Sequence, residues 1–379
     1  MCDYRRSPKF FAAGLILFLS ALPAARAAEN LLAPRNFYSA ATCSTSSCHG
    51  GATEKSCQLT IWSTQDAHSK SYATLTNARS ARMAEALQIP NPAQNPRCTA
   101  CHAPLSAVAI PTNGTPGLIG NFATESVSCV SCHGPSDAWI RTHTRPDYTH
   151  AERVAAGMKD IRSPYARANT CVACHQNIDP ELVSLARHPE LIFELDGQAA
   201  SEPKHWQESA GWSGAQQWYV GQLVAVREVS WGLARKTISA EREIPRYRAL
   251  AWLTARAGGT APSMGSDFTA AVTAADAAAR AVSSETWAPA RAAETLRRFA
   301  AAAPDFRDAV VPQPEQARRA EALVLALDRL LLASSTAGRT PAASAALNKL
   351  FALAQSRPDF VPAAFAQALE EFAATLPPG

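Results

Sequence analysis

Apolar positions follow a helical period only in the second half of the chain. From about residue 211 onward they recur every three or four residues, which is the spacing of one face of an α-helix. The apolar stripes are Tyr219, Leu223, Val226, Val229 and Leu233; Ala320, Leu323, Leu327, Leu330 and Leu331; and Phe365, Leu369, Phe372 and Leu376. Each stripe predicts a helix that buries one face. We therefore expect an Ala-rich α-helical bundle over residues 211–379.

Residues 29–210 lack this period and have a different composition. Stretches such as Pro90–Pro96 and Pro111–Pro116 are rich in Pro, Gly, Asn and Thr, which predicts loops joining short helices. A region of this kind cannot form a large aliphatic core. Its fold must therefore depend on something other than its own apolar side chains.

The first 28 residues have the layout of a signal peptide. They contain a basic stretch, an apolar run and an Ala-x-Ala site: Arg5, Arg6 and Lys9; Phe10–Leu22; and Ala25–Ala27. The apolar run is short for a membrane span, and the small residues match a cleavage site. An uncleaved anchor is the alternative. No later segment is long and apolar enough to span a bilayer, so we expect a periplasmic chain with no membrane span.

Four cysteine pairs in the region 29–210 each end in a histidine. Three read Cys-x-x-Cys-His, and the first has four intervening residues: Cys43, Cys48 and His49; Cys98, Cys101 and His102; Cys129, Cys132 and His133; Cys171, Cys174 and His175. Each thiol can add to one vinyl group of a porphyrin, and the histidine then lies below the iron as its proximal ligand. Zinc sites or disulfides are the alternative. Since every pair is followed directly by histidine, the pattern favours four covalently bound haem c groups.

The remaining five histidines are candidates for the sixth ligand of each iron. They are His68, His143, His150, His188 and His205, and none of the nine histidines lies after residue 205. Such clustering is expected of axial ligands. There are thus five candidates for the four sixth-ligand positions. His143 and His150 are close in sequence, so one could be a ligand and the other a proton donor. At His188, the following proline predicts the first turn of a helix.

Cys57 is the one cysteine after the leader that lies outside the four motifs. It could be a buried thiol. Alternatively it could form a disulfide with Cys43, which would leave the first haem attached through Cys48 alone.

The charge balance argues against nucleic acid as a partner. The formal net charge is +4, but the leader carries four basic residues and one acidic residue, so the rest of the chain is near +1. Each haem adds two propionates, which makes the loaded protein acidic. We therefore expect redox partner proteins and no binding of nucleic acid.

The motifs resemble the cytochrome c-554-like tetrahaem family of multihaem c-type cytochromes. Three features carry the resemblance: Cys48-His49-Gly50 after the long first spacer, the run Ser126–Pro135 around the third motif, and Trp139 four residues before His143. It covers about half of the chain, Asn36–Trp206. The resemblance implies closely stacked haems, mostly with two histidine ligands each, that pass electrons. Members of the family can include one haem with an open position, and related multihaem enzymes act on small nitrogen oxides.

These observations predict a mainly α protein with three parts. Residues 1–28 form the signal peptide, residues 29–210 a tetrahaem cytochrome c domain with short helices and long loops, and residues 211–379 the helical bundle. The expected function is electron relay between redox partners, more an electron-transfer protein than a catalyst. The alternative is a multihaem oxidoreductase that acts on a small nitrogen compound at one five-coordinate haem. A structural subunit of a larger redox complex is the third hypothesis.

Overall fold

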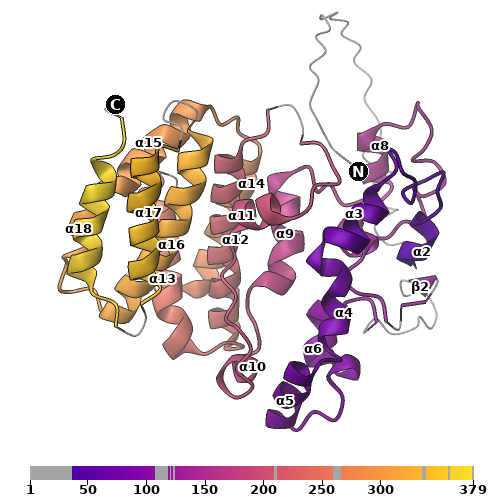
Figure 1. The fold of residues 1–379 in the computed structure, drawn as a ribbon, viewed down its shortest axis with the longest axis horizontal. Helices are drawn as coiled ribbons and strands as arrows, with labels where there is room; N and C mark the ends of the chain where they lie inside the picture. Colours follow the sequence, from indigo (N-terminus) through magenta and orange to yellow (C-terminus); the bar gives the residue numbers. More distant parts are fainter. Residues whose placement is uncertain are drawn as a thin grey trace, which may run out of the picture. The chain divides into compact units, whose positions relative to one another are not determined.

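The fold is known from a computed structural model, which describes residues 36–106, 118–119, 121–122, 124–208, 211–258, 266–334, 339–356 and 359–377. The expected signal peptide, residues 1–28, and the loop Pro111–Pro116 lie outside the described residues. Helices dominate the described part, and its strands are two residues long, so the prediction of a mainly α fold is confirmed (Figure 1). Two compact units form: Met1–Asp160 with Pro203–Gln207, and Ile161–Glu202 with Glu208–Gly379.

The first unit consists of short helices joined by loops, as the composition indicated. Its α-helices are α2 (Ala40–Cys43), α3 (Gln58–Gln65), α4 (Ser71–Thr74), α5 (Ala78–Ala86), α6 (Pro96–His102), α7 (Cys129–His133) and α8 (His150–Ala155). Two 3₁₀ turns, η1 (Ala67–Lys70) and η2 (Pro92–Gln94), and a parallel pair of strands, β1 (Phe37–Tyr38) and β2 (Leu118–Ile119), complete it. Polar side chains start several of these helices: Asn77 and Asn95, for example, accept backbone N–H groups of the first turn.

The apolar core of the first unit is small. Among the described residues its hydrophobic cluster consists of Leu105, Phe122 and Val130, with Phe37 packed against them, and other buried apolar side chains, such as Ile61 and Leu75, lie outside this cluster. This agrees with the expectation that the region cannot build a large aliphatic core. A core of this size offers little hydrophobic stabilisation against the entropy of ordering the chain.

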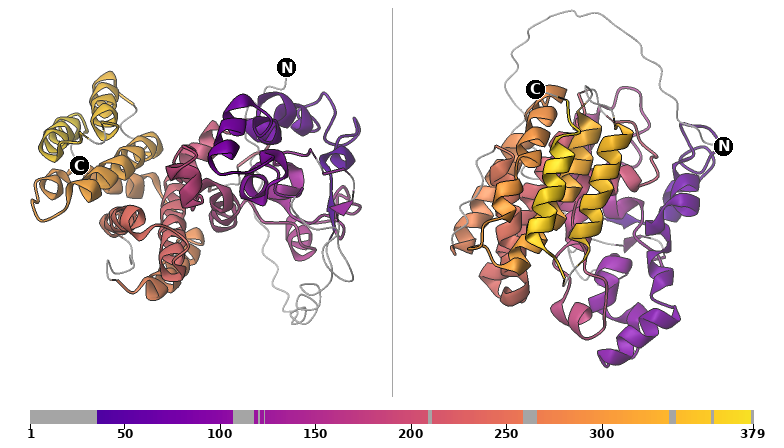
Figure 2. Two further views of the ribbon diagram at one scale, coloured as in Figure 1. Left: turned by 90° about the horizontal axis from the view of Figure 1, so that it is seen from below. Right: turned by 60° about the vertical axis from the view of Figure 1, so that its left-hand side comes forward.

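The second unit is a bundle of longer helices. They are α9 (Pro164–His175), α10 (Pro180–Ser184), α11 (Leu195–Ser201), α12 (Gly214–Arg235), α13 (Ala240–Arg256), α14 (Phe268–Ser283), α15 (Pro289–Ala300), η3 (Ala303–Phe306), α16 (Gln313–Ala333), α17 (Pro341–Ala354) and α18 (Pro362–Ala373). Helices α16, α17 and α18 lie side by side (Figure 2). Pro362 begins α18. None of the described helices is long and apolar enough to cross a bilayer.

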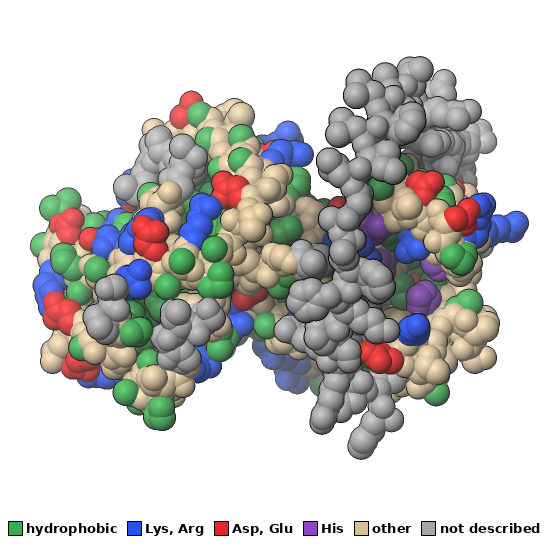
Figure 3. All heavy atoms as spheres, turned by 90° about the horizontal axis from the view of Figure 1, so that it is seen from above, with side chains coloured by type: hydrophobic (Ala, Val, Ile, Leu, Met, Phe, Trp, Pro, Cys, Tyr) green, Lys and Arg blue, Asp and Glu red, His purple; other side chains and the backbone are tan. Residues whose placement is uncertain are grey.

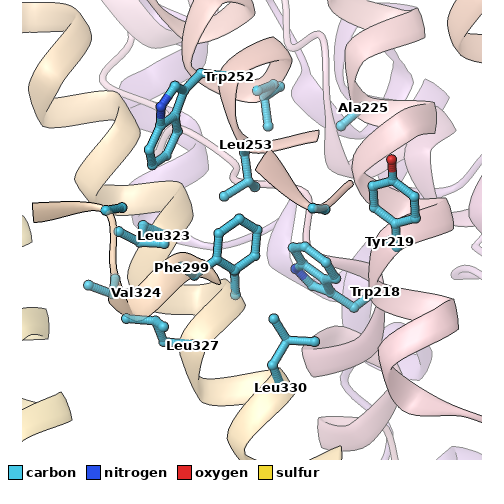
Figure 4. Close-up of a cluster of buried hydrophobic side chains, with 14 of the residues drawn as sticks. Trp218, Tyr219, Ala225, Trp252, Leu253, Phe299, Leu323, Val324, Leu327 and Leu330 are labelled. Atoms are coloured by element: carbon cyan, nitrogen blue, oxygen red, sulfur yellow. The ribbon is translucent and has the colours of Figure 1, made fainter. Parts of the chain in front are cut away.

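The predicted apolar stripes form the core of this bundle. Leu223, Leu323, Leu327 and Leu369 are fully buried, and only Leu376 of the three stripes is partly exposed. Figure 4 shows leucines of α16 facing Phe299 and Trp218, and the Trp218 and Phe299 rings meet edge to face at 5.7 Å. Helix α12 is central, because it packs on α9, α11, α13, α14 and α16.

The fourth cysteine motif belongs to this second unit. From the sequence we expected it to fold with the first three motifs in residues 29–210, whereas the boundary between the two compact units lies after residue 160. The reason is that α9, which ends in this motif, packs its buried residues Ala168 and Val172 into the core of the bundle.

The prediction that a helix begins near His188 and Pro189 is wrong. Arg187 has a positive φ of 55°, and the His188 N–H bonds back to the Leu182 carbonyl, which closes the turn after α10. The chain then continues without helix to Leu195. Helix α11 begins there because the Glu194 carboxylate accepts the N–H groups of Asp196 and Gly197.

Candidate haem-attachment sites

The first motif closes into a turn despite its longer spacer. Helix α2 ends at Cys43, the N–H of Cys48 bonds to the Thr45 carbonyl, and the N–H of His49 returns to the Cys43 carbonyl at 3.2 Å. The four spacer residues therefore loop out and leave the histidine next to the first cysteine. His49 Nδ1 lies 3.0 Å from Gln58 Oε1, at the start of α3.

The third motif lies beside the first. It is the whole of α7, which has a capping box between Ser128 and Ser131 and ends at Gly134, where φ is +81°. The Cys129 thiol donates to the Cys43 sulfur, which lowers the pKa of Cys43 and raises that of Cys129; burial raises the Cys129 value further. Two motifs separated by more than eighty residues thus meet at their first cysteines.

The second motif forms the C-terminal part of α6. Its histidine, His102, is held through Nδ1, which lies 3.0 Å from the Ser71 carbonyl oxygen and 2.9 Å from Thr74 Oγ1. The Ser71 hydroxyl donates to the carbonyls of both His68 and His102 at 2.8 Å and accepts the Val127 N–H. Ser71 therefore joins the backbones around two of the predicted ligands.

The fourth motif ends α9 and is fixed to the bundle directly after its histidine. Gln176 donates to the Ala225 carbonyl at 2.8 Å, and Asn177 donates to the Glu228 carbonyl at 2.9 Å. Both carbonyls belong to α12. Upstream in α9, Arg167 is buried with ion-pair contact to Glu208 and lies 4.5 Å above the Trp212 ring.

His49 and His143 face each other in the first unit. Their ring centroids are 6.1 Å apart, and the ring planes differ by 17°. His143 is fixed by its Nδ1–H, which donates to the Ile140 carbonyl at 2.6 Å, and by the edge of Trp139, whose centroid is 5.6 Å away. Burial lowers the pKa of His143. Both rings use Nδ1 for their hydrogen bonds, so Nε2 is the nitrogen left for a metal.

His133 and His205 also lie near this pair. Burial, and then the charges of His205, His49 and Lys159, lower the pKa of His133 to about 4. Burial likewise lowers the pKa of His205, whose ring meets Trp206 edge to face at 5.2 Å. Neutral imidazoles are the form that binds a metal. Histidine side chains gather on the face of the first unit seen in Figure 3.

His68 is oriented by a buried carboxylate. Asp66 begins the turn η1 and lies 3.0 Å from His68 Nδ1. Its pKa is lowered: burial opposes ionisation, but the hydrogen bonds and charge of His68 outweigh that effect. A carboxylate at Nδ1 is the usual outer partner of a metal-binding histidine that presents Nε2.

The last two predicted ligands have different surroundings. His150 uses Nε2 instead of Nδ1: this atom lies 2.9 Å from Asp160 Oδ1. His188 belongs to the second unit, and its Nδ1–H donates to the Pro189 carbonyl at 2.8 Å. His150 therefore has its Nε2 bonded to a carboxylate.

The motif residues fit covalently bound haem. Seven of the eight motif cysteines are half-buried, and Cys48 is exposed, so the sulfur atoms lie at or near the surface of their units. Cys57 is buried, and its thiol donates to the Glu54 carbonyl at 3.8 Å. Thiols paired with adjacent, mostly Nδ1-bonded imidazoles are the donor set that haem c uses.

The side chains that orient these imidazoles were not predicted, because none of them belongs to a sequence motif and they lie away from their histidines in the chain. They are Gln58, Ser71, Asp160 and Gln198. Asp66 could have been found, because an Asp two residues before a histidine can cap a turn and reach its ring.

Comparison with known proteins supports the cytochrome assignment. Residues 42–134 match the family model described as cytochrome c554 and c-prime. This segment contains the whole of the first, second and third motifs. No curated protein and no solved structure matches the chain. Over the region that carries its first three cysteine–histidine motifs, the chain is therefore similar to cytochrome c554 and c-prime, a likeness that supports a c-type cytochrome with covalently bound haem in electron transfer.

Proposed function

We propose that the protein is an exported, periplasmic tetrahaem cytochrome that relays electrons between redox partner proteins. In this proposal each Cys–His motif holds one haem c, through Cys43 and Cys48, Cys98 and Cys101, Cys129 and Cys132, and Cys171 and Cys174. His49, His102, His133 and His175 are the proximal ligands. Most of the irons carry a second histidine.

The arrangement of His49 and His143 is the observation that carries this proposal. Two imidazoles bound to opposite sides of one iron through metal–nitrogen bonds of about 2 Å have ring centroids roughly 6 Å apart. The centroid distance between His49 and His143 is 6.1 Å. Since both rings are anchored through Nδ1, this distance supports a bis-histidine iron at the first motif.

The hydrogen bonds of the other candidates support relay more than catalysis. Five histidines are available for four sixth positions, and His150 has its Nε2 bonded to Asp160. If His68, His143, His188 and His205 are the four ligands, every haem is six-coordinate and no iron has an open position for a substrate. Bound haem supplies one-electron chemistry, and the protein sets its potential through axial ligation, burial and nearby charge.

Electron paramagnetic resonance of the oxidised, purified protein, with haem quantified on the same sample, tests the proposal. We expect four haems per chain and only low-spin signals. A high-spin signal from one haem, altered by cyanide or nitric oxide, would instead support an oxidoreductase acting on a small nitrogen compound. Absence of covalent haem would contradict both functions. Co-purification with an enzyme under native conditions would identify a partner.

A further inference from the structure

The helical unit fixes the fourth motif through a network that spans three helices. Arg227 of α12 donates to Asn169 of α9 at 2.6 Å and to Asp276 of α14 at 2.7 Å. Tyr165 of α9 donates to the same Asp276 carboxylate at 2.6 Å. With the contacts of Gln176 and Asn177 to α12, both ends of the motif segment are held by the bundle. The contacts of the bundle on both sides of the motif therefore fix the position of His175 within the second unit.

One side chain contacts the imidazole of His175 from a separate helix. Gln198 of α11 has its Nε2 3.5 Å from His175 Nδ1, and the same Nε2 donates to the Ile192 carbonyl at 3.2 Å. The other end of the amide, Gln198 Oε1, is buried and accepts no hydrogen bond in the described structure.

Helix α11 holds this amide firmly. The Glu194 carboxylate caps its first turn. Leu195 is fully buried against Gly221 of α12, where a methyl group on the glycine would lie 2.6 Å from the Leu195 Cβ. Such close packing fixes the distance of Gln198 from α12 and thus from α9, because α9 packs on the same helix.

We propose that Gln198 is a positioning residue for the fourth haem: it orients His175 and sets how strongly this imidazole donates to the iron. The proposal rests on haem attachment at Cys171 and Cys174. An imidazole that binds iron through Nε2 carries a proton on Nδ1 and so needs an acceptor. The buried Oε1 of Gln198 becomes that acceptor when the side-chain amide group flips, which exchanges the positions of Oε1 and Nε2.

This rotation has a consequence for the candidate sixth ligand. It removes the donor from the Ile192 carbonyl, in the segment that follows His188. Arg246 donates to the Leu191 carbonyl at 3.0 Å, and Arg318 forms a bidentate ion pair with Glu190, so the bundle still holds this segment. One amide thus links the proximal ligand of the fourth haem to the segment that carries His188.

The test uses the full-length, haem-loaded chain and three variants of α11. Gln198→Glu supplies an anionic acceptor, which strengthens the Nδ1 hydrogen bond and favours the oxidised iron. Gln198→Leu removes the hydrogen bond at similar volume. Ser201→Ala is the control: Ser201 is exposed on the same helix and donates to the backbone carbonyl of Gln198 at 2.9 Å, so this variant disturbs the backbone of Gln198 while keeping its amide side chain. A variant with Cys171→Ala and Cys174→Ala shows which redox transition belongs to the fourth haem.

We expect the midpoint potential of that transition to shift downward in Gln198→Glu and upward in Gln198→Leu, and to stay unchanged in Ser201→Ala. The other three transitions should not move. The resonance Raman and paramagnetic resonance signatures of the fourth haem should change in the same two variants. If either variant loads haem poorly, Gln198→Asn, which keeps an amide but shortens it, should give the shift of Gln198→Leu.

Two failures have different meanings. Four attached haems with identical potentials and spectra in wild type and every Gln198 variant would overturn the role of Gln198. If the wild-type chain carries no haem that the Cys171→Ala, Cys174→Ala variant lacks, the fourth attachment site itself is wrong, whatever Gln198 does.

Discussion

Hydrogen bonding at the two imidazole nitrogens separates histidines that the sequence treats alike. His143 and His150 are seven residues apart, and from the sequence His150 is the weaker candidate only because it lies so close to His143. In the structure His143 donates through Nδ1 to a backbone carbonyl, whereas His150 Nε2 is bonded to Asp160. A ring anchored at Nδ1 is ready to bind iron at Nε2 with its tautomer already fixed. We therefore propose the ligand role for His143 and a role outside the iron's ligand set for His150.

This assignment predicts opposite results for two alanine variants. His143→Ala should leave the iron of the first motif without its sixth ligand and give a new high-spin signal that cyanide converts to low spin. His150→Ala should keep the wild-type low-spin spectrum, because it removes only the bond to Asp160. Electron paramagnetic resonance of the two oxidised proteins, at equal haem content, makes the comparison. A high-spin signal in His150→Ala and none in His143→Ala would reverse the assignment.

Glu194 is the clearest case of an acid with a perturbed pKa in the helical unit. Burial and the neighbouring Asp196 raise the pKa of Glu194 from an ordinary 4.5 to about 7, although Arg329 and two backbone N–H groups oppose the shift. Because the folded-state pKa is the higher one, the folded protein binds the proton more tightly than the unfolded chain. This group therefore stabilises the fold most below pH 4.5, and that contribution is lost as the pH rises through 7.

Glu194→Gln should remove this pH dependence. Relative to the variant, the wild-type free energy of unfolding should fall by about 3 kcal/mol between pH 4.5 and pH 8, an order-of-magnitude figure from 1.36 kcal/mol per pKa unit. Urea unfolding of both proteins at several pH values, followed by circular dichroism, measures the difference. Asp267→Asn, which also removes a helix-capping carboxylate but an exposed one, is the control. Parallel pH curves for wild type and Glu194→Gln would show that Glu194 ionises normally.

At the scale of the elements, the contact between α11 and α12 depends on a missing side chain. Gly221 lies in the middle of α12, where alanine normally favours a helix by about 1 kcal/mol over glycine. Here a Cβ atom would lie 2.6 Å from the Cβ of Leu195. Steric overlap of this kind in a packed core costs about 1–3 kcal/mol and outweighs the gain in helix propensity.

Gly221→Ala should therefore destabilise the bundle and displace α11. Thermal or urea unfolding should show a net loss of up to about 2 kcal/mol, once the propensity gain is subtracted from the steric cost. Arg235→Ala, at an exposed position of the same helix, should change stability by less than about 0.5 kcal/mol. A more stable Gly221→Ala protein would mean that Leu195 can move away without cost.

The elements differ in how far local sequence determines them. The long helices of the bundle were predictable, because an apolar residue every three or four positions is a local signal; Leu223, Leu323 and Leu369 are buried as the stripes required. The helix expected after Pro189 was not formed. Proline suits a first turn, but a helix also needs a cap, and the cap of α11 is Glu194.

The candidate sites show the same division. The cysteine motifs could be identified because attachment chemistry is encoded within a few residues. The residues that contact each imidazole could not be predicted from the sequence, because contacts such as His102 to Ser71 or His49 to His143 join positions far apart in the chain. Nor could spacing reveal that the fourth motif folds with the bundle, because this follows from long-range contacts of Gln176 and Asn177 with α12.

At the scale of the whole molecule, the two units should respond differently to loss of haem. The described hydrophobic cluster of the first unit has three buried residues with Phe37 packed against them and only scattered buried apolar side chains outside it, whereas the second unit has an extended core built from Trp218, Phe299 and many leucines. Folding requires enough buried apolar area to offset the conformational entropy of the ordered chain. The second unit meets this requirement without a cofactor, and the first does not.

A chain in which all eight motif cysteines are replaced by alanine should accordingly keep its helical unit and lose the fold of its first unit. Far-ultraviolet circular dichroism should retain most of its helical signal, because most of the helical residues belong to α9 and α11–α18. Hydrogen exchange should find the amides of α12 and α16 protected and those of α3, α6 and α7 exchanging freely. The haem-loaded chain, in which both sets are protected, is the control. Protection of α6 and α7 without haem would mean that the first unit folds on its own contacts, and simultaneous loss of both sets would mean that haem stabilises the entire chain as one cooperative unit.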